Sequence, residues 1–367
     1  MRGEMMSTSL TLDSYRLLGR SGLRVSPLSL GTMTFGTEWG WGADRQESGR
    51  IFNEYVERGG NFIDTANMYT NGTAEELIGS LLQGRREQLV IGTKYTLPMQ
   101  PGNANSCGNH RKNMVSSAEN SLRRLRTDYI DVFYLHAWDA TTPIDEILRA
   151  LDDLVRAGKV LYLGISGTVA WQISRMQATA DLRGWSPFIA LQIEYNLVER
   201  TAERELIPMA MEMGLGVIPS SPLAGGVLTG KYTRADVEGN RSEAQWQGSR
   251  RGALLASGAL SQRNLVVAEV VRGIAAEIER PPSQVALAWL LSHRAVASPT
   301  IGAHTLEQLH ENIGALEVSL TSTHLDKLAR ASAIEPGFPH DHLARMETLG
   351  FLFGNMKIAR RGSWPST

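Results

Sequence analysis

Residues 61–82, NFIDTANMYTNGTAEELIGSLL, contain one complete strand-to-helix step. The run NFID has the composition of a buried β-strand, and Asp64 stands where its apolar residues end. The chain then turns, and Thr73 with Glu76 predicts a capping box ahead of an apolar helix face that includes Leu77. A strand, a polar residue at its carboxyl end and a helix form the repeating unit of parallel α/β sheets.

The same step recurs along the chain. Strand-like runs occupy residues 27–32, 61–65, 89–94, 129–136, 160–166, 188–195, 215–221 and 296–302, with amphipathic helical segments between them. One such helix is predicted from Thr142 and Pro143, with Ile147 and Leu148 on its apolar face, to Gly158. Eight βα units favour one closed (β/α)8 TIM barrel over an open doubly wound sheet.

We therefore expect a single domain over residues 1–367, with its barrel core at about 15–330. Residues 15–30, YRLLGRSGLRVSPLSL, predict an N-terminal β-hairpin that turns near Ser21 and covers the bottom of the barrel. The polar stretch from Thr233 to Ser261 forms a long loop after strand 7, and it could cover a bound ligand. Residues 335–367 form a C-terminal extension.

Composition indicates a small-molecule partner. Of the 367 residues, 42% are hydrophobic and 20% are charged, and the formal net charge is −1. Such a balance gives no electrostatic reason to expect nucleic acid or an anionic membrane surface. Cys107 is the only cysteine, and the N-terminal residues lack the apolar core of a secretory signal, so we expect a reducing, cytoplasmic location. The apolar run VALAWLL is too short to span a membrane.

Polar or small residues stand at the carboxyl ends of the predicted strands, which form the catalytic face of a barrel. They are Asp64, Lys94, His136, Ser166, Gln192, Ser220 and Gly302. Lys94 is the natural counter-ion of Asp64, because a buried carboxylate needs a paired cation; a purely structural salt bridge is the alternative.

Tyr69 and His136 favour the catalytic interpretation of this ion pair. A phenol has an ordinary pKa of about 10, and it donates its proton poorly near neutrality unless a neighbouring ammonium such as that of Lys94 stabilises the phenolate. His136 could hydrogen-bond a substrate oxygen or orient the phenol, or it could simply cap its strand.

These residues and their surrounding motifs resemble the aldo-keto reductase superfamily. The resemblance covers roughly residues 15–330 and rests on GGNFIDTANMY, VIGTKY, YIDVFYLHAWD, LQIEYNLVER and SSPLAGGVLTGKY. It implies a (β/α)8 barrel that binds a nicotinamide dinucleotide in extended form without a GxGxxG motif. It also implies that Tyr69 is the general acid and that Lys94 lowers its pKa. Asp64 would then hold Lys94, and His136 would orient the carbonyl.

The same resemblance implies a cofactor site for NADP(H). Ser166 and Gln192 would bind the nicotinamide carboxamide, and the backbone amides of Ser221, Leu223 and Gly225 would face the pyrophosphate, with Lys231 adding charge. Thr305 and Gln308 predict a capping box at the amino end of a helix, which would attract the adenosine phosphate. Gln308 and Asn312 match the adenosine-side positions.

Three positions depart from the family pattern. Gly167 stands where relatives often carry Asn, and Ser220 stands where many carry an aromatic residue that stacks on the nicotinamide. His304 replaces a frequent Arg beside the 2′-phosphate, so NAD remains an alternative cofactor.

The resulting hypothesis is a reversible, NADPH-dependent reduction of an aldehyde or ketone to an alcohol. Keto-sugars and natural-product ketones are within the substrate range, and Trp39, Trp41 and Trp138 either form a wall for the substrate or pack within their loops. An alternative is a cofactor-binding regulatory subunit resembling the potassium-channel β subunits. A metal-dependent hydrolase is a third class, but it needs several clustered His and acidic ligands, and we expect no metal site. The sequence carries no signal for the oligomeric state.

Overall fold

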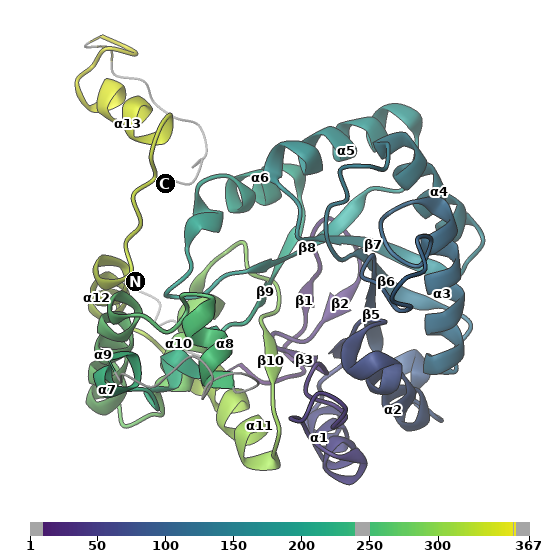
Figure 1. Cartoon of the computed structure of the whole chain (residues 1–367). Coiled ribbons are helices and arrows are strands. Elements are labelled where there is room, and N and C mark those ends of the chain that lie inside the picture. The colour runs from purple at the N-terminus through teal and green to yellow at the C-terminus, as the bar shows by residue number, and fades with distance from the viewer. Residues whose placement is uncertain (1–9, 239–249, 355, 357–367) are drawn as a thin grey trace, which may run out of the picture.

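Eight parallel strands form one sheet that curls into a barrel with helices on its outside (Figure 1). The computed structural model describes residues 10–238, 250–354 and 356. In chain order the barrel strands are β3 (Ser29–Gly31), β4 (Phe62–Asp64), β5 (Val90–Tyr95), β6 (Ile130–Leu135), β7 (Val160–Ser166), β8 (Phe188–Glu194), β9 (Gly216–Ser220) and β10 (Thr300–Gly302). Consecutive strands pair from β3 to β9, and β10 pairs with β3.

The gap between β9 and β10 is closed just before β10 begins. The Val217 N–H donates to the Ala295 carbonyl at 3.1 Å, and the Ala297 N–H donates to the Val217 carbonyl at 2.8 Å. The barrel is therefore nearly continuous around its circumference. This confirms the (β/α)8 fold expected from the sequence.

One helix follows each of the first six barrel strands. These helices are α1 (Arg45–Glu57), α2 (Thr73–Leu81), α3 (Arg111–Leu125), α4 (Ile144–Arg156), α5 (Ala170–Arg183) and α6 (Leu206–Met213). The connection from β9 to β10 contains α7 (Arg234–Glu238), α8 (Arg250–Ala256), α9 (Gln262–Glu277) and α10 (Pro282–Ser292). After β10 come α11 (Leu306–Ile313), α12 (Ser322–Ala331) and α13 (His340–Thr348).

Apolar faces explain why these helices pack on the sheet. In α4, Ile144, Ile147, Leu148 and Leu151 are all buried, as the helical spacing predicts. Pro143 is the N-cap of this helix instead of its first residue, a shift of one position.

The predicted N-terminal hairpin is present. Its strands are β1 (Arg16–Leu17) and β2 (Arg24–Val25), and the Leu18 N–H donates to the Leu23 carbonyl at 2.9 Å across the turn. Leu18 and Val25 are buried in a cluster with residues from the beginnings of the barrel strands, among them Phe62. The hairpin therefore covers the amino ends of the strands, opposite Asp64.

The capping box expected at α2 is absent. Three successive residues after Tyr69 are left-handed, with φ of 45° at Thr70, 58° at Asn71 and 102° at Gly72. This turn makes Gly72 the N-cap and puts Thr73 inside the helix. The Thr70 hydroxyl accepts the Ala74 N–H at 3.1 Å instead, and it donates to the Phe35 carbonyl at 2.7 Å.

The two long segments outside the barrel have some regular structure. The stretch from Thr233 to Ser261 begins with α7 and contains α8 near its end, while residues 239–249 lie outside the described part of the chain. The C-terminal extension contains α13, which stands away from the barrel and has no buried residue (Figure 1). Among the described residues, no helix is long and apolar enough to cross a membrane.

Candidate active site

Four polar residues meet at the carboxyl end of the barrel. Asp64 is the last residue of β4, Lys94 lies in β5, Tyr69 begins the 3-10 helix η1 (Tyr69–Gly72), and His136 follows β6. The Lys94 Nζ donates to Asp64 Oδ2 at 2.8 Å, to the Thr65 carbonyl at 2.7 Å and to the Tyr69 hydroxyl at 3.3 Å. The ammonium therefore joins the carboxylate to the phenol.

Burial and neighbouring charge act in opposite directions on the pKa of Lys94. The Lys94 side chain is 0% exposed and that of Asp64 is 5% exposed. Burial is the largest single effect and disfavours the ammonium, but the interactions with Asp64 and Tyr69 together outweigh it, so the pKa of Lys94 is raised. Lys94 therefore stays charged at neutral pH.

The phenol differs in part from the sequence-based expectation. Burial raises the pKa of Tyr69, and the charge of Lys94 lowers it. Asp64 adds to the increase, and the net pKa lies above the ordinary value. Lys94 thus contributes in the expected direction, but burial is stronger, and Tyr69 stays protonated at neutral pH.

His136 is held beside Tyr69 as a neutral imidazole. The two rings meet edge to face with centroids 6.2 Å apart, and the backbone N–H of His136 donates to the Thr96 hydroxyl oxygen at 3.2 Å. Burial, with the nearby Lys94 charge, lowers the pKa of His136 to about 3. Its buried Nδ1 has no partner among the described residues.

A cavity of about 530 Å³ opens beside Asp64 and Tyr69. Ten of the residues proposed for the cofactor line it, namely Gln192, Ser220, Ser221, Leu223, Gly225, Lys231, Gly302, His304, Gln308 and Asn312. Ser166 and His136 are not among the lining residues, although Ser166 pairs in register with Gln192 across β7 and β8. The cavity extends from the phenol to the beginning of α11.

Several lining residues were not anticipated. Met33 and Thr34 follow the first barrel strand, and Glu311 lies one turn beyond Gln308 in α11. Met33 and Thr34 would have been found by including the residues that directly follow each predicted strand. The Gln192 amide was expected to bind the cofactor, and in this structure it donates to Asp64 Oδ1 at 2.8 Å. Both carboxylate oxygens of Asp64 are therefore hydrogen-bonded.

The loop after β9 lines the cavity and has several residues in the left-handed conformation. Ser221 and Ala224 have φ of 49°, and Gly225 and Gly226 have φ of 63° and 98°. A Cβ atom at Gly226 would lie 2.7 Å from Lys231 Nζ, so a lysine charge lies against bare backbone there. Left-handed backbone next to a cation is a suitable environment for an anion.

At the beginning of α11 the expected capping box is half present. The Thr305 hydroxyl accepts the Gln308 N–H at 3.4 Å, which confirms Thr305 as the N-cap. The Gln308 side chain accepts the His304 N–H at 2.8 Å instead of that of Thr305. Asn312 donates to the Gly302 carbonyl at 3.1 Å, so both side chains brace the segment that carries His304.

Of the three tryptophans considered as a wall for the substrate, Trp39 and Trp41 lie next to the site. The rings of Trp39 and Trp41 are 5.7 Å apart; Trp39 is 6.4 Å from Tyr69, and Trp41 is 6.0 Å from His304. Trp138 instead packs against the hydrophobic core. Within the described residues, no cluster of three or more His, Cys, Asp or Glu side chains could hold a metal ion.

A TIM barrel with a hydrogen-bonded Asp, Lys and Tyr beside a cavity is compatible with an oxidoreductase, and the comparisons with known proteins show this class. The chain belongs to the aldo/keto reductase family, whose model matches residues 27–333. It is 35% identical over 334 residues to an aryl-alcohol dehydrogenase [NADP(+)] of Phanerodontia chrysosporium, covering 87% of this chain and 86% of the relative.

Two further relatives span most of the chain. A norsolorinic acid reductase of Aspergillus flavus is 34% identical over 351 residues, with 93% of this chain and 86% of the relative covered. An uncharacterized oxidoreductase of Bacillus subtilis, YrpG, is 38% identical over 316 residues, with 83% and 92% covered. These matches confirm the family resemblance and the assignment as an oxidoreductase.

Proposed function

We propose that this protein reversibly reduces an aldehyde or ketone to an alcohol with NADPH, using Tyr69 as the general acid. The observation that carries the proposal is the Lys94 ammonium, which contacts both the Asp64 carboxylate and the Tyr69 hydroxyl at the mouth of the cavity. The bound nicotinamide would supply the hydride, which leaves proton donation and orientation to the protein.

In the reduction direction, Tyr69 must hold a proton and release it as charge develops on the substrate oxygen. Its raised pKa keeps the phenol protonated, and the adjacent Lys94 stabilises the phenolate that remains after the transfer. His136 is neutral, so it acts as a hydrogen-bond donor to the carbonyl oxygen and does not compete as an acid.

The cavity residues fit an extended dinucleotide. Gln192, which lines the cavity, and Ser166, which pairs with it across β7 and β8 outside the lining, would hold the carboxamide, with Ser220 beside the nicotinamide. Ser221, Leu223, Gly225 and Lys231 would face the pyrophosphate, since left-handed backbone and a lysine charge meet there. At the other end, Gly302, His304, Gln308 and Asn312 would surround the adenosine and its phosphate at the amino end of α11.

We further propose a preference for aromatic carbonyl compounds. Trp39 lies edge to face with Tyr69, so it offers a flat apolar surface next to the proposed proton donor. The similarity to an aryl-alcohol dehydrogenase agrees with this preference.

Loss of NADPH absorbance with a panel of aromatic aldehydes, aliphatic aldehydes and keto-sugars tests the proposal. Tyr69→Phe should lower turnover by about 100-fold or more while NADPH affinity is kept, because only the proton donor is removed. Tyr55→Phe is the matched control: it removes a buried hydroxyl that donates to the Leu28 carbonyl, away from the cavity. Wild-type turnover in Tyr69→Phe, when chemistry limits the rate, would rule out Tyr69 as the acid.

A further inference from the structure

The turn after β8 connects to the cavity through one buried side chain. Asn196 is 0% exposed, and its Oδ1 accepts the N–H groups of Val198 and Glu199, both at 2.9 Å. Its Nδ2 donates to the Ser221 carbonyl at 3.0 Å. A single amide therefore both closes its own turn and holds the first residue of the loop after β9.

Ser221 needs such support because its backbone is strained. A left-handed conformation at a residue other than glycine is uncommon, and it persists only where its surroundings enforce it. The Ser221 carbonyl accepts two donors, the Asn196 amide and the Ala224 N–H at 2.8 Å. These two bonds fix the orientation of the peptide plane from which the cavity-lining segment Pro222–Leu223 continues.

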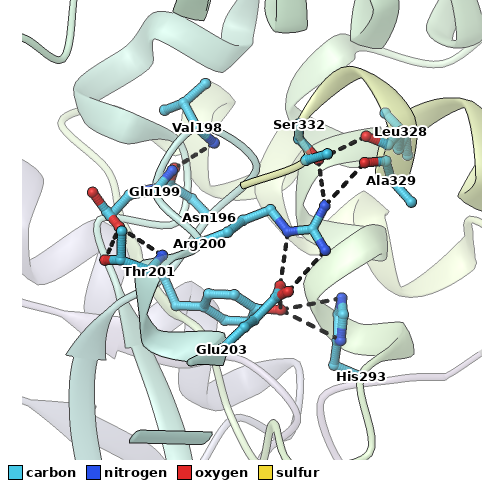
Figure 2. A network of polar contacts seen from close by, with 12 residues as sticks. Asn196, Val198, Glu199, Arg200, Thr201, Glu203, His293, Leu328, Ala329 and Ser332 are labelled. Carbon is cyan, nitrogen blue, oxygen red and sulfur yellow. Dashed lines mark hydrogen bonds and ion pairs between the residues drawn. The ribbon is translucent and has the colours of Figure 1, made fainter. Parts of the chain in front are cut away.

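The turn that carries Asn196 is itself anchored on its far side, as Figure 2 shows. Arg200 makes two contacts of 2.8 Å with the Glu203 carboxylate, and it donates to the Ser332 hydroxyl at 2.8 Å and the Ala329 carbonyl at 3.2 Å (Figure 2). The Tyr195 hydroxyl donates to Glu203 Oε1 at 2.7 Å. Arg200 therefore connects the turn to the C-terminal end of α12, and these contacts hold the turn that carries Asn196 in place.

We propose that Asn196 is a positioning residue for cofactor binding: it fixes the Ser221 carbonyl, and it thereby sets the backbone N–H groups of the following loop toward the pyrophosphate. The inference rests on the proposed function, because it takes the loop after β9 as the pyrophosphate site. Asn196 itself does not touch the cavity.

Two variants separate this role from general stability. Asn196→Ala removes all three side-chain hydrogen bonds. Asn196→Asp keeps an acceptor for the Val198 and Glu199 N–H groups, and it replaces the donor to Ser221 by an acceptor oxygen that would face the Ser221 carbonyl. Each should weaken both NADPH and NADH binding by about tenfold in fluorescence titrations, because both cofactors contain the pyrophosphate. Binding of adenosine 2′-monophosphate, which has no pyrophosphate, should be unchanged.

Steady-state kinetics give an independent readout. KM for NADPH should rise in both variants, while kcat at saturating NADPH and KM for the carbonyl substrate stay close to wild type. Asn61→Ala is the matched control, because Asn61 accepts the Ser26 N–H at 2.8 Å and donates to the Arg24 carbonyl at 2.9 Å near the hairpin at the other end of the barrel. It should lower the melting temperature and leave cofactor affinity unchanged.

The outcomes distinguish the inference from the function on which it rests. If wild type binds NADPH and both Asn196 variants bind it equally well, Asn196 does not position the loop. Weakening of adenosine 2′-monophosphate to the same extent would mean that the substitutions disturb the whole site, which also overturns the inference. If wild type bound neither dinucleotide, the proposed function would fail first.

Discussion

Replacement of Lys94 by Met tests whether the Asp64 carboxylate depends on its ammonium. The side chains are of similar length, so the change removes the charge and its hydrogen bonds with little change in volume. In the native protein the pair is at 2.8 Å and both side chains are almost fully buried. After the substitution, Asp64 keeps the hydrogen bond from Gln192 and loses its counter-ion.

A buried charge left without its partner costs about 3–5 kcal/mol. For a domain with a total stability of about 5–15 kcal/mol, this is a large fraction. A second substitution, Asp64→Asn, removes the unpaired charge. The double variant should therefore be more stable than Lys94→Met alone, by about 2 kcal/mol or more.

Urea unfolding followed by circular dichroism measures both free energies of unfolding. Lys159→Met is the control, because Lys159 pairs with Glu119 and their side chains are 40% and 42% exposed, so its loss should cost only about 0–1 kcal/mol. The reasoning is refuted if the double variant is less stable than Lys94→Met, or if Lys94→Met costs no more than Lys159→Met.

Two further predictions concern histidines. Because the pKa of His136 is about 3 in the folded protein and near 6.5 when unfolded, the unfolded state alone gains a proton as pH falls below about 6.5. Between pH 7 and pH 5 wild type should therefore lose about 2 kcal/mol more stability than His136→Gln, and parallel stability curves for the two proteins would disprove the neutral imidazole. His304→Arg should strengthen NADPH binding near pH 8 by about 1–2 kcal/mol and leave NADH nearly unchanged, because a guanidinium makes charge-assisted contacts with a 2′-phosphate. An NADPH-to-NADH affinity ratio unmoved by the substitution, in fluorescence titrations, would place His304 outside the phosphate site.

The barrel could be predicted from sequence because each strand is an apolar run bounded by turn residues. The run 160–166 coincides with β7, and six of the other predicted runs each contain an observed strand that is shorter at one or both ends. The run 89–94 is displaced by one residue from β5 (Val90–Tyr95). The α2 cap was missed because its geometry depends on a distant residue. Thr70 is held in its left-handed conformation partly by the Phe35 carbonyl, a contact that local patterns do not contain.

The candidate site, like the fold, could be predicted from the sequence only in part. Asp64 and Lys94 were predictable because parallel strands bring their carboxyl ends to one edge of the barrel. The hydrogen bond from Gln192 to Asp64 spans the barrel interior between residues 128 apart, and the contact of Asn196 with Ser221 joins two separate loops. No spacing rule encodes such pairs, so they emerge only from the folded structure.

The departure at Gly167 has a physical explanation in the backbone. Gly167 has φ of 48°, and a Cβ atom there would lie 2.8 Å from the His136 carbonyl oxygen. Its own carbonyl accepts the Trp138 N–H at 3.1 Å. A side chain at position 167 would therefore press on the loop that carries His136, so glycine keeps that loop close to β7 at the expense of one side-chain contact.

The protonation states of the site depend on one another in a definite order. Burial alone would lower the pKa of Lys94, and the interactions with Asp64 and Tyr69 together reverse this effect, with Asp64 the larger contributor of the two. The charge of Lys94 then helps to keep His136 neutral, and it offsets part of the increase that burial imposes on the pKa of Tyr69. If Asp64 were neutral, Lys94 would lose the larger of these two interactions, and its stabilisation of a Tyr69 phenolate would be weaker. Asp64 therefore acts on Tyr69, the proposed proton donor, both directly through its charge and indirectly through Lys94, although no hydrogen bond joins Asp64 to Tyr69 among the described residues.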